Sequence, residues 1–109
     1  MDLAAAYAAR EPAWVDFTAR VISQPHYFYG RRTHCVHEAF DVQSSSGPLE
    51  VVDNVSIAPR CPVQRGDEIE VRGLMVHDRG KPPLVHWTHH DPSRERAGGF
   101  IRLRGTVYA

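Results

Sequence analysis

Short alternating segments separated by turn residues are the feature that most limits how this chain can fold. In residues 15–21 every odd-numbered side chain is apolar and every even-numbered one is polar. Successive side chains of a strand point to opposite faces, so this pattern predicts a half-buried strand. Runs such as Ser-Ser-Ser-Gly-Pro at 44–48 mark the turns between strands. Together these signals predict strands at residues 14–23, 35–43, 49–53, 68–76, 84–88, 100–103 and 106–108.

The predicted strands follow one another in hairpin series and do not alternate with helices, which excludes a doubly wound α/β fold and favours a small barrel. One helix is expected at residues 3–10, where Asp2 caps an alanine-rich run. Residues 66–73 resemble the fourth strand of many OB-folds, a Greek-key barrel of five strands. The sequence therefore predicts a mainly β protein: a small OB-like β-barrel of five to seven short strands with one short N-terminal helix.

The length of 109 residues argues for one domain, in which residues 1–12 dock as the helix and residues 13–109 form the barrel. Thirteen basic and thirteen acidic side chains give a net charge of zero, which weighs against a general nucleic-acid coat or a membrane-surface protein. No apolar run is long enough for a membrane helix, and no leader sequence is visible. We therefore expect a cytoplasmic protein, or an exported one if a leader has been removed. Cys35 and Cys61 are too few for a disulfide framework, and free thiols are expected, although a single bridge stays open.

A dense polar string, His-Trp-Thr-His-His-Asp-Pro, occupies residues 86–92 at the end of a predicted strand. His86 and Thr88 are expected on the same face of that strand, and the following loop can fold back over them. Histidine has an unperturbed pKa of about 6.5 and is the natural acid or base near neutral pH. The candidate catalytic residues are therefore the members of this string and one histidine from an earlier strand: His37, His86, His89, His90 and Asp91.

Three interpretations of the string remain open. Imidazole and carboxylate groups suit a divalent transition metal, with His86, His90 and Asp91 as the expected ligands and His89 or His37 as alternatives, although the spacing matches no standard site. Two histidines could instead transfer protons in phosphodiester cleavage without a metal. The string could also be a hydrogen-bond network that only stabilises the barrel.

Residues 24–33 are expected to form a loop in which aromatic side chains precede arginines. Tyr29, Arg31 and Arg32 there could stack on bases and contact phosphates, as in proteins that bind single-stranded nucleic acid. The same residues could simply pack beneath a surface loop.

The string at 86–92 resembles the signature of an uncharacterised bacterial family, domain of unknown function 3465. Residues 53–60 resemble that family's His-Asn-Ile-Asp-Leu-Ala-Pro-Arg segment, residues 37–40 its Arg-His-Gln-x-Phe strand, and residues 99–108 its Gly-Trp-Ile…Gly…Tyr ending. The resemblance extends from about Leu3 to the C-terminus. The chain departs from the family pattern at four positions, where it has Glu38 for Gln, Asp53 for His, Ser56 for Asp and Phe100 for Trp.

This resemblance implies a small β-barrel and a site of His37, Asn54, His86, His89, His90 and Asp91, and it implies no activity. We therefore expect a binding protein for a phosphate-bearing ligand or single-stranded nucleic acid. The expected ligand-binding residues are Asn54, Asp53, Thr88, Trp87, Arg31, Arg32 and Tyr29. One alternative is a metal-dependent phosphodiesterase or nuclease-like hydrolase that uses the histidines. The other is a structural or interaction protein without catalysis.

Overall fold

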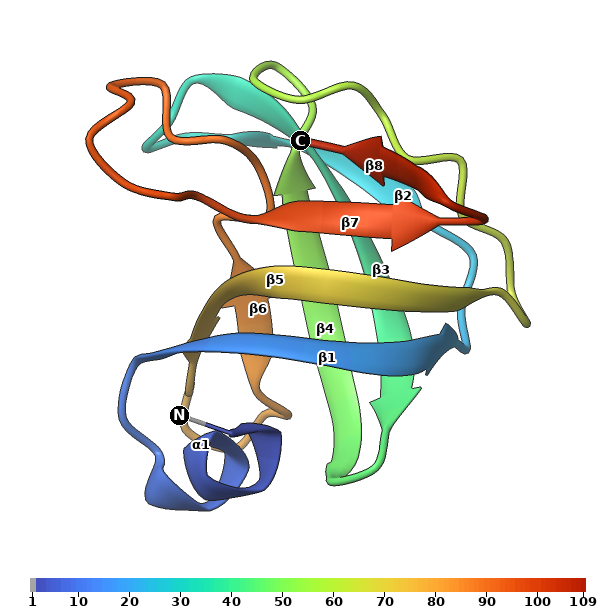
Figure 1. Cartoon of the computed structure of the whole chain (residues 1–109). Coiled ribbons are helices and arrows are strands. Elements are labelled where there is room, and N and C mark those ends of the chain that lie inside the picture. Colours follow the sequence, from blue (N-terminus) through green and yellow to red (C-terminus); the bar gives the residue numbers. More distant parts are fainter. Residues whose placement is uncertain (1) are drawn as a thin grey trace.

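Eight strands and one short helix form within residues 2–109, which the computed structural model describes (Figure 1). Residue 1 of the expected docking segment 1–12 lies outside the described residues. The elements along the chain are α1 (Leu3–Ala9), β1 (Ala13–Val21), β2 (His26–Gly30), β3 (Cys35–Ser44), β4 (Gly47–Asn54), β5 (Glu68–Val76), β6 (Leu84–His86), β7 (Phe100–Leu103) and β8 (Thr106–Tyr108).

Five of the strands close into a ring in the order β1-β3-β4-β6-β5, because β5 pairs back onto β1. Every neighbouring pair in the ring is antiparallel except β4 and β6, which are parallel. This is the strand order and direction of an OB barrel, so the expected OB-like fold is confirmed. In Figure 1, β1 and β5 cross in front of β3, β4 and β6.

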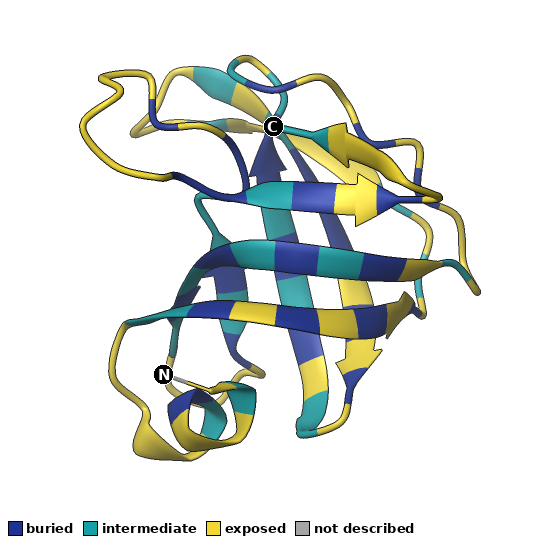
Figure 2. Ribbon diagram, viewed as in Figure 1, coloured by how far each residue is buried: buried dark blue, intermediate teal, exposed yellow. Residues whose placement is uncertain are grey.

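The core fills the space between these two crossed layers. Inward positions alternate with outward ones along each strand, as the sequence pattern predicts, and the bands of buried residues along β1 and β5 are visible in Figure 2. The largest fully buried apolar side chains are Phe40, Leu49, Met75 and Ile101. Each stabilises the fold by roughly 1.5–3 kcal/mol through removal of its surface from water. Two carboxyl groups, of Glu38 and Asp53, are also fully buried.

The segment expected as a loop at 24–33 contains a strand, and this expectation is wrong. Residues His26–Gly30 form β2, which pairs antiparallel with the first half of β3. The aromatic run at 27–29 favours a strand. The apolar and polar alternation that normally reveals one is missing, because four of the five β2 residues are exposed.

The strand expected at 84–88 ends two residues early, at His86. Trp87 has a left-handed φ of 57°, which turns the chain out of the strand. As a result Thr88 does not share a face with His86. The Thr88 side chain instead enters the barrel interior and is fully buried.

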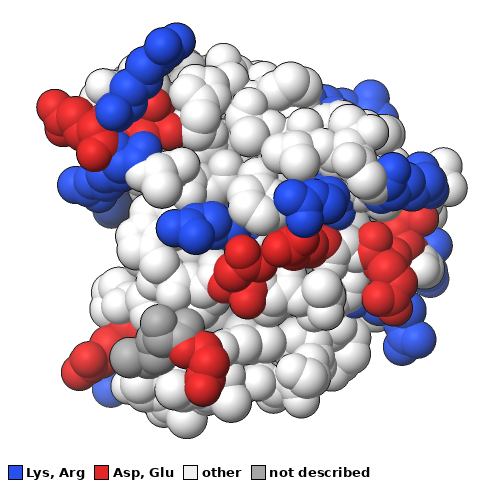
Figure 3. Space-filling model, viewed as in Figure 1, with Lys and Arg blue, Asp and Glu red and all other residues white. Residues whose placement is uncertain are grey.

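The helix and the last hairpin lie outside the ring. Asp2 caps α1 by accepting from Ala5 N at 2.8 Å, and Tyr7 Oη donates to Pro48 O at 3.0 Å, so the predicted helix docks on the β3–β4 turn. Strand β7 extends the sheet beyond β5, and β8 pairs with β7. Acidic and basic side chains are interspersed on the face above these strands (Figure 3), where Arg102 pairs with Glu70.

Cys35 and Cys61 are both free, in line with the expectation of unbridged thiols. Within residues 2–109, no helix has the length and apolar character that crossing a bilayer requires.

Candidate functional site

A cavity of about 610 Å³ lies on the outer face of β3, β4 and β6. Strand β2 borders one side, and the loop that joins β6 to β7 borders another. In Figure 1 the three strands lie behind β1 and β5, so the cavity is on the side away from the viewer. We call it the β3–β4–β6 pocket; its lining residues are Phe28, Thr33, Cys35, His37, Glu50, Val52, Asn54, Ile57, Leu84, His86, Trp87, His89 and Pro92.

Five of the residues expected at the site line this pocket: His37, Asn54, His86, Trp87 and His89. They come from three strands and one loop. His37 and Asn54 are direct cross-strand partners of β3 and β4, which explains how residues 17 positions apart reach one surface. The structure thus brings together the histidine of the second predicted strand and part of the 86–92 string.

His37 packs one ring face against β2 and has one buried ring nitrogen. Its ring stacks on Phe28, with the centroids 5.3 Å apart and the planes inclined by 15°. Nδ1 of His37 is buried and has no hydrogen-bond partner among the described residues. A buried polar atom without a partner costs free energy and calls for a water or a ligand.

His86 repeats this situation on the neighbouring strand. Its Nε2 is buried and, within residues 2–109, has no partner. Burial lowers the pKa of His86, and the nearby His89 and His37 lower it further. The His86 imidazole is therefore neutral at pH 7, with one nitrogen as donor and one as acceptor.

His89 has a fixed ring orientation. Its Nδ1 donates to the carbonyl oxygen of His90 at 2.7 Å, since a carbonyl can only accept. In the neutral ring this leaves Nε2 as an acceptor. The ring also packs against Trp87, with centroids 5.3 Å apart.

Asp91 organises the loop and does not face the pocket. Its Oδ1 accepts from Ser93 N at 3.0 Å and from Ser93 Oγ at 2.8 Å, and its Oδ2 accepts from Arg96 N at 3.0 Å. The Ser93 hydroxyl is the main cause of the lowered pKa of Asp91. Both carboxylate oxygens are therefore engaged within the loop, and Asp91 is not among the residues that line the pocket.

The expected metal ligands His86, His90 and Asp91 do not form a site. His90 is exposed, and no group of three or more His, Cys, Asp or Glu side chains in residues 2–109 is close enough to hold a metal ion. The turn at Asp91 directs its carboxylate into the loop, which separates it from His86.

The remaining expected residues lie around the pocket or beneath it. Asp53 and Thr88 point into the barrel and are fully buried. Tyr29 is 60% exposed on β2, and Arg31 and Arg32 are exposed in the turn after it. Thr33 of the same turn lines the pocket, and the two arginines precede it in the chain without lining the pocket themselves.

Trp87 has the most unusual backbone of the site. A positive φ is rare for a bulky residue, and such strain tends to occur at functional positions. Close packing maintains it: a Cβ on Gly99 would lie 2.2 Å from Trp87 O, and one on Gly73 would lie 2.5 Å from His86 O. Two glycines therefore allow the chain to turn here and place Trp87 in the pocket wall.

A family model described as "Protein of unknown function (DUF3465)" matches residues 27–109. The chain belongs to the DUF3465 family. The match starts later than the resemblance from Leu3 suggested, and it excludes α1 and β1. Every residue that lines the β3–β4–β6 pocket of this DUF3465 protein lies inside the matched segment. No curated protein matches the chain.

Several pocket residues of the DUF3465 protein, such as Glu50, have no place in the site expected from the sequence, whereas Phe28 belongs to the aromatic run at 27–29 expected to stack on bases from a loop. The alternation along β4 puts Glu50 and Val52 on the same outer face as Asn54, so that signal was present. Phe28 required the recognition of β2 as a strand, because only its pairing with β3 sets the Phe28 ring on His37.

Gly30 sets the position of His37 in the DUF3465 protein. A Cβ at this position would lie 2.8 Å from His37 Cε1 and 2.6 Å from Thr33 Oγ1. Both contacts are with side chains that can move, so we expect Gly30→Ala to fold with a loss of stability of about 1 kcal/mol. The imidazole signals of His37 in a two-dimensional NMR spectrum should shift while those of His77, far from β2, stay in place. Unchanged His37 signals would contradict this contact.

Proposed function

We propose that this protein binds a planar, hydrogen-bonding ring of the nucleobase type in the β3–β4–β6 pocket, with the attached phosphate at the rim. The observation that carries the proposal is the pair of unpartnered ring nitrogens, Nδ1 of His37 and Nε2 of His86. Both belong to residues that line one cavity. A ligand edge with matching donors and acceptors would satisfy both nitrogens at once.

The walls of the pocket suit a flat, partly apolar molecule. Phe28 and Trp87 offer aromatic surface, and Val52, Ile57 and Leu84 are aliphatic. The volume of about 610 Å³ falls within the usual range of ligand pockets, which combine apolar walls with a few polar groups. Stacking of a base on an aromatic side chain contributes roughly 1–3 kcal/mol.

The cations favour a phosphate at the rim and not inside. No Lys or Arg is among the residues that line the pocket. Arg31 and Arg32 directly precede Thr33, which lines the pocket at the turn after β2. A neutral ring inside and a phosphate at this turn are therefore compatible with the charges, whereas a phosphate inside the pocket would meet neutral His86 and Glu50.

The position on the barrel supports a binding function. OB barrels bind oligonucleotides and oligosaccharides on the face of their second and third strands, which are β3 and β4 in this ring. The metal-dependent hydrolase has weaker support, because its expected ligand set does not meet. A purely structural role would require a bound water at each of the two unpartnered nitrogens.

The proposal can be tested by isothermal titration calorimetry of the purified chain with nucleosides, mononucleotides and short single-stranded oligonucleotides. For each compound that binds the wild type, we expect His86→Ala to lower the affinity by about tenfold, which corresponds to the loss of one hydrogen bond. Nucleoside binding should be insensitive to salt. Oligonucleotide affinity should fall with a slope of about 0.7 per phosphate contact in log–log form.

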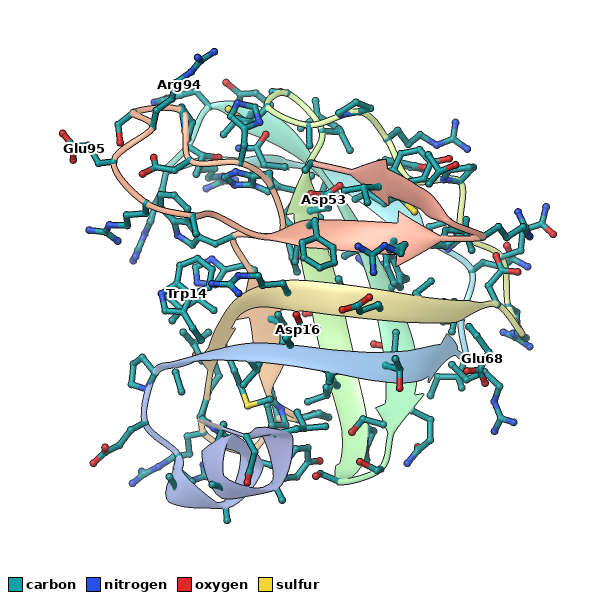
Figure 4. The ribbon with its side chains drawn as sticks, viewed as in Figure 1. Trp14, Asp16, Asp53, Glu68, Arg94 and Glu95 are labelled. Atoms are coloured by element: carbon teal, nitrogen blue, oxygen red, sulfur yellow. The ribbon has the colours of Figure 1, made fainter. Side chains whose placement is uncertain are left out.

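The rim arginines provide a matched comparison. Arg31→Ala and Arg32→Ala should weaken the binding of mononucleotides and leave the binding of nucleosides unchanged. Arg94→Ala is the control variant, because the removed cation points away from the barrel (Figure 4). The proposal fails if no probe binds, or if His86→Ala lowers only the melting temperature and leaves binding intact, the result that a structural role predicts.

A further inference from the structure

A pair of carboxyl groups lies inside the barrel directly beneath the pocket. Glu38 and Asp53 are cross-strand partners in the β3–β4 register, and both side chains are completely buried. Figure 4 shows Asp53 near the C-terminal end of β4. Directly opposed residues of two antiparallel strands have Cβ atoms roughly 5 Å apart, so carboxyl groups at such positions can meet.

Each carboxyl group has one oxygen engaged and one without a partner. Tyr27 Oη donates to Glu38 Oε2 at 3.1 Å, and Thr88 Oγ1 donates to Asp53 Oδ1 at 2.9 Å. The other oxygens, Glu38 Oε1 and Asp53 Oδ2, are buried and unpartnered among the described residues. Two ionised carboxylates in this arrangement would be like charges in a medium of low polarity, which is strongly unfavourable.

The contacts of Thr88 also favour a protonated pair. Its single hydroxyl lies 2.9 Å from Asp53 Oδ1 and 3.2 Å from the carbonyl oxygen of Val52. One hydroxyl proton cannot fully serve two acceptors. While the Thr88 proton points to Val52 O, Asp53 Oδ1 lacks its donor, which disfavours the ionised form of Asp53.

We propose that Glu38 and Asp53 hold a shared proton at neutral pH, and that its release at higher pH loosens the end of the barrel that carries the pocket. On release, one proton passes to solvent and two carboxylates remain, which repel each other across β3 and β4. Their hydrogen-bond partners connect them to both walls of the pocket: Tyr27 precedes Phe28, and Thr88 follows Trp87. The proposal does not depend on what the pocket binds.

The surroundings of the pair support retention of the proton. Tyr27 faces it from β2, Thr88 from the segment after β6, and Arg60 and Cys61 from the connector between β4 and β5. Burial raises the pKa of Asp53 to about 7, and the charge of Glu38 adds to this. Burial also raises the pKa of Glu38, against the lowering effects of Tyr27 and Arg60.

Cys61 does not supply a compensating charge. Burial, with Glu38 and Asp53 beside it, raises the pKa of its thiol to about 12. Asp67 and Arg104, which also act on Cys61, form an ion pair with each other. Arg60 is the one cation of the described residues that acts on the pair, and its guanidinium lies over the Tyr27 ring, 5.7 Å from the centroid.

The sign of the pH effect follows from these directions. A carboxyl group whose pKa is raised in the folded state binds more protons there than in the unfolded chain, where the Asp value is about 3.9. The contribution of the pair to stability is therefore full below the unfolded value of about 4, and it is lost as the pH rises to the folded-state value of about 7 for Asp53. His86 acts oppositely, because its lowered pKa destabilises the fold on the acid side.

The direct test is a titration of the full chain labelled with carbon-13 at Asp and Glu side-chain carboxyl carbons. Two buried carboxyl carbons should titrate together near or above neutral pH. In Glu38→Gln/Asp53→Asn these signals should disappear, and so should the loss of stability that the pair causes in the wild type between about pH 4 and pH 7, measured as the fall in melting temperature. Asp41→Asn is the matched control, because Asp41 lies on the same strand β3 but faces outward and does not line the pocket. It should retain the loss of stability between about pH 4 and pH 7.

A second readout follows the pocket wall. The chain has two tryptophans, so in a Trp14→Phe background the fluorescence reports Trp87 alone. We expect it to change with the same midpoint as the carboxyl pair, and this change to vanish in the neutral double variant. If both carboxyl groups are ionised in folded protein at pH 6, the shared proton is ruled out, even if the double variant does not fold. If the Trp87 fluorescence does not change as the carboxyl pair titrates, the proposed effect of the pair on the pocket is wrong.

Discussion

Gly99→Ala should be among the most damaging single substitutions in this protein. A Cβ at this position would lie 2.2 Å from Trp87 O and 2.3 Å from Arg72 O. Both are backbone atoms, and neither can move without separating β5 from β7 or breaking the bond from Gly99 N to His89 O, which is 2.7 Å long. We expect a loss of about 3 kcal/mol in the free energy of unfolding. For a domain of this size the melting temperature should fall by roughly 10–20 °C.

Gly105→Ala is the control for this prediction. A Cβ on Gly105 would meet no atom within 4 Å, and only its positive φ of 81° opposes a side chain. The expected loss is about 1 kcal/mol. Similar melting temperatures for the two variants would show that the close approach of Gly99 to Trp87 does not hold the loop in place.

Asp91→Ala should disorder the loop between β6 and β7. The substitution removes the acceptor of three hydrogen bonds, from Ser93 N, Ser93 Oγ and Arg96 N. The loop carries His89 and Pro92 of the pocket wall, so binding should weaken together with stability. We expect the melting temperature to fall by roughly 5–10 °C, and amide exchange in residues 89–98 to become faster.

Two comparisons separate this structural role from a catalytic one. Asp91→Asn retains an acceptor for Ser93 and should lie between wild type and Asp91→Ala. The lowered pKa of Asp91 means that its stabilising effect is present above the unfolded value of about 3.9 and is lost as the pH falls through the folded value. Asp91→Asn should lack that loss on the acid side. An Asp91→Ala variant with unchanged stability and loop exchange would contradict the assignment.

Much of the barrel could be predicted because its determinants are local. Alternation in residues 15–21 and 68–73 identifies β1 and β5, and these strands close the ring by pairing with each other along their length. The turn residues at 44–48 place the β3–β4 hairpin. Strand β2 could not be identified in this way, since exposure of both its faces removes the alternation.

The site could be predicted only in part, because tertiary contacts decide the rest. The 86–92 string identifies His86 and His89, and the family resemblance adds His37 and Asn54. The turn at Trp87, however, depends on the close approach of two glycines to the backbone at 86–87. Gly73 lies in β5, and Gly99 lies just before β7. That turn sends Thr88 inward to Asp53, and the register of β3 and β4 then sets Asp53 against Glu38. Neither contact has a sequence signal of its own.

The central claim is that the β3–β4–β6 pocket binds a planar ring through His37 and His86. Its most direct test is a titration of nitrogen-15 histidine-labelled protein with a mononucleotide, followed through the ring nitrogens. The claim predicts large shifts at His37 Nδ1 and His86 Nε2, which have no partner in the described residues. His77, whose Nε2 donates to Ala6 O at 3.0 Å on another side of the barrel, should not shift. Equal shifts at all three histidines, or none at His37 and His86 with saturating nucleotide, would contradict it.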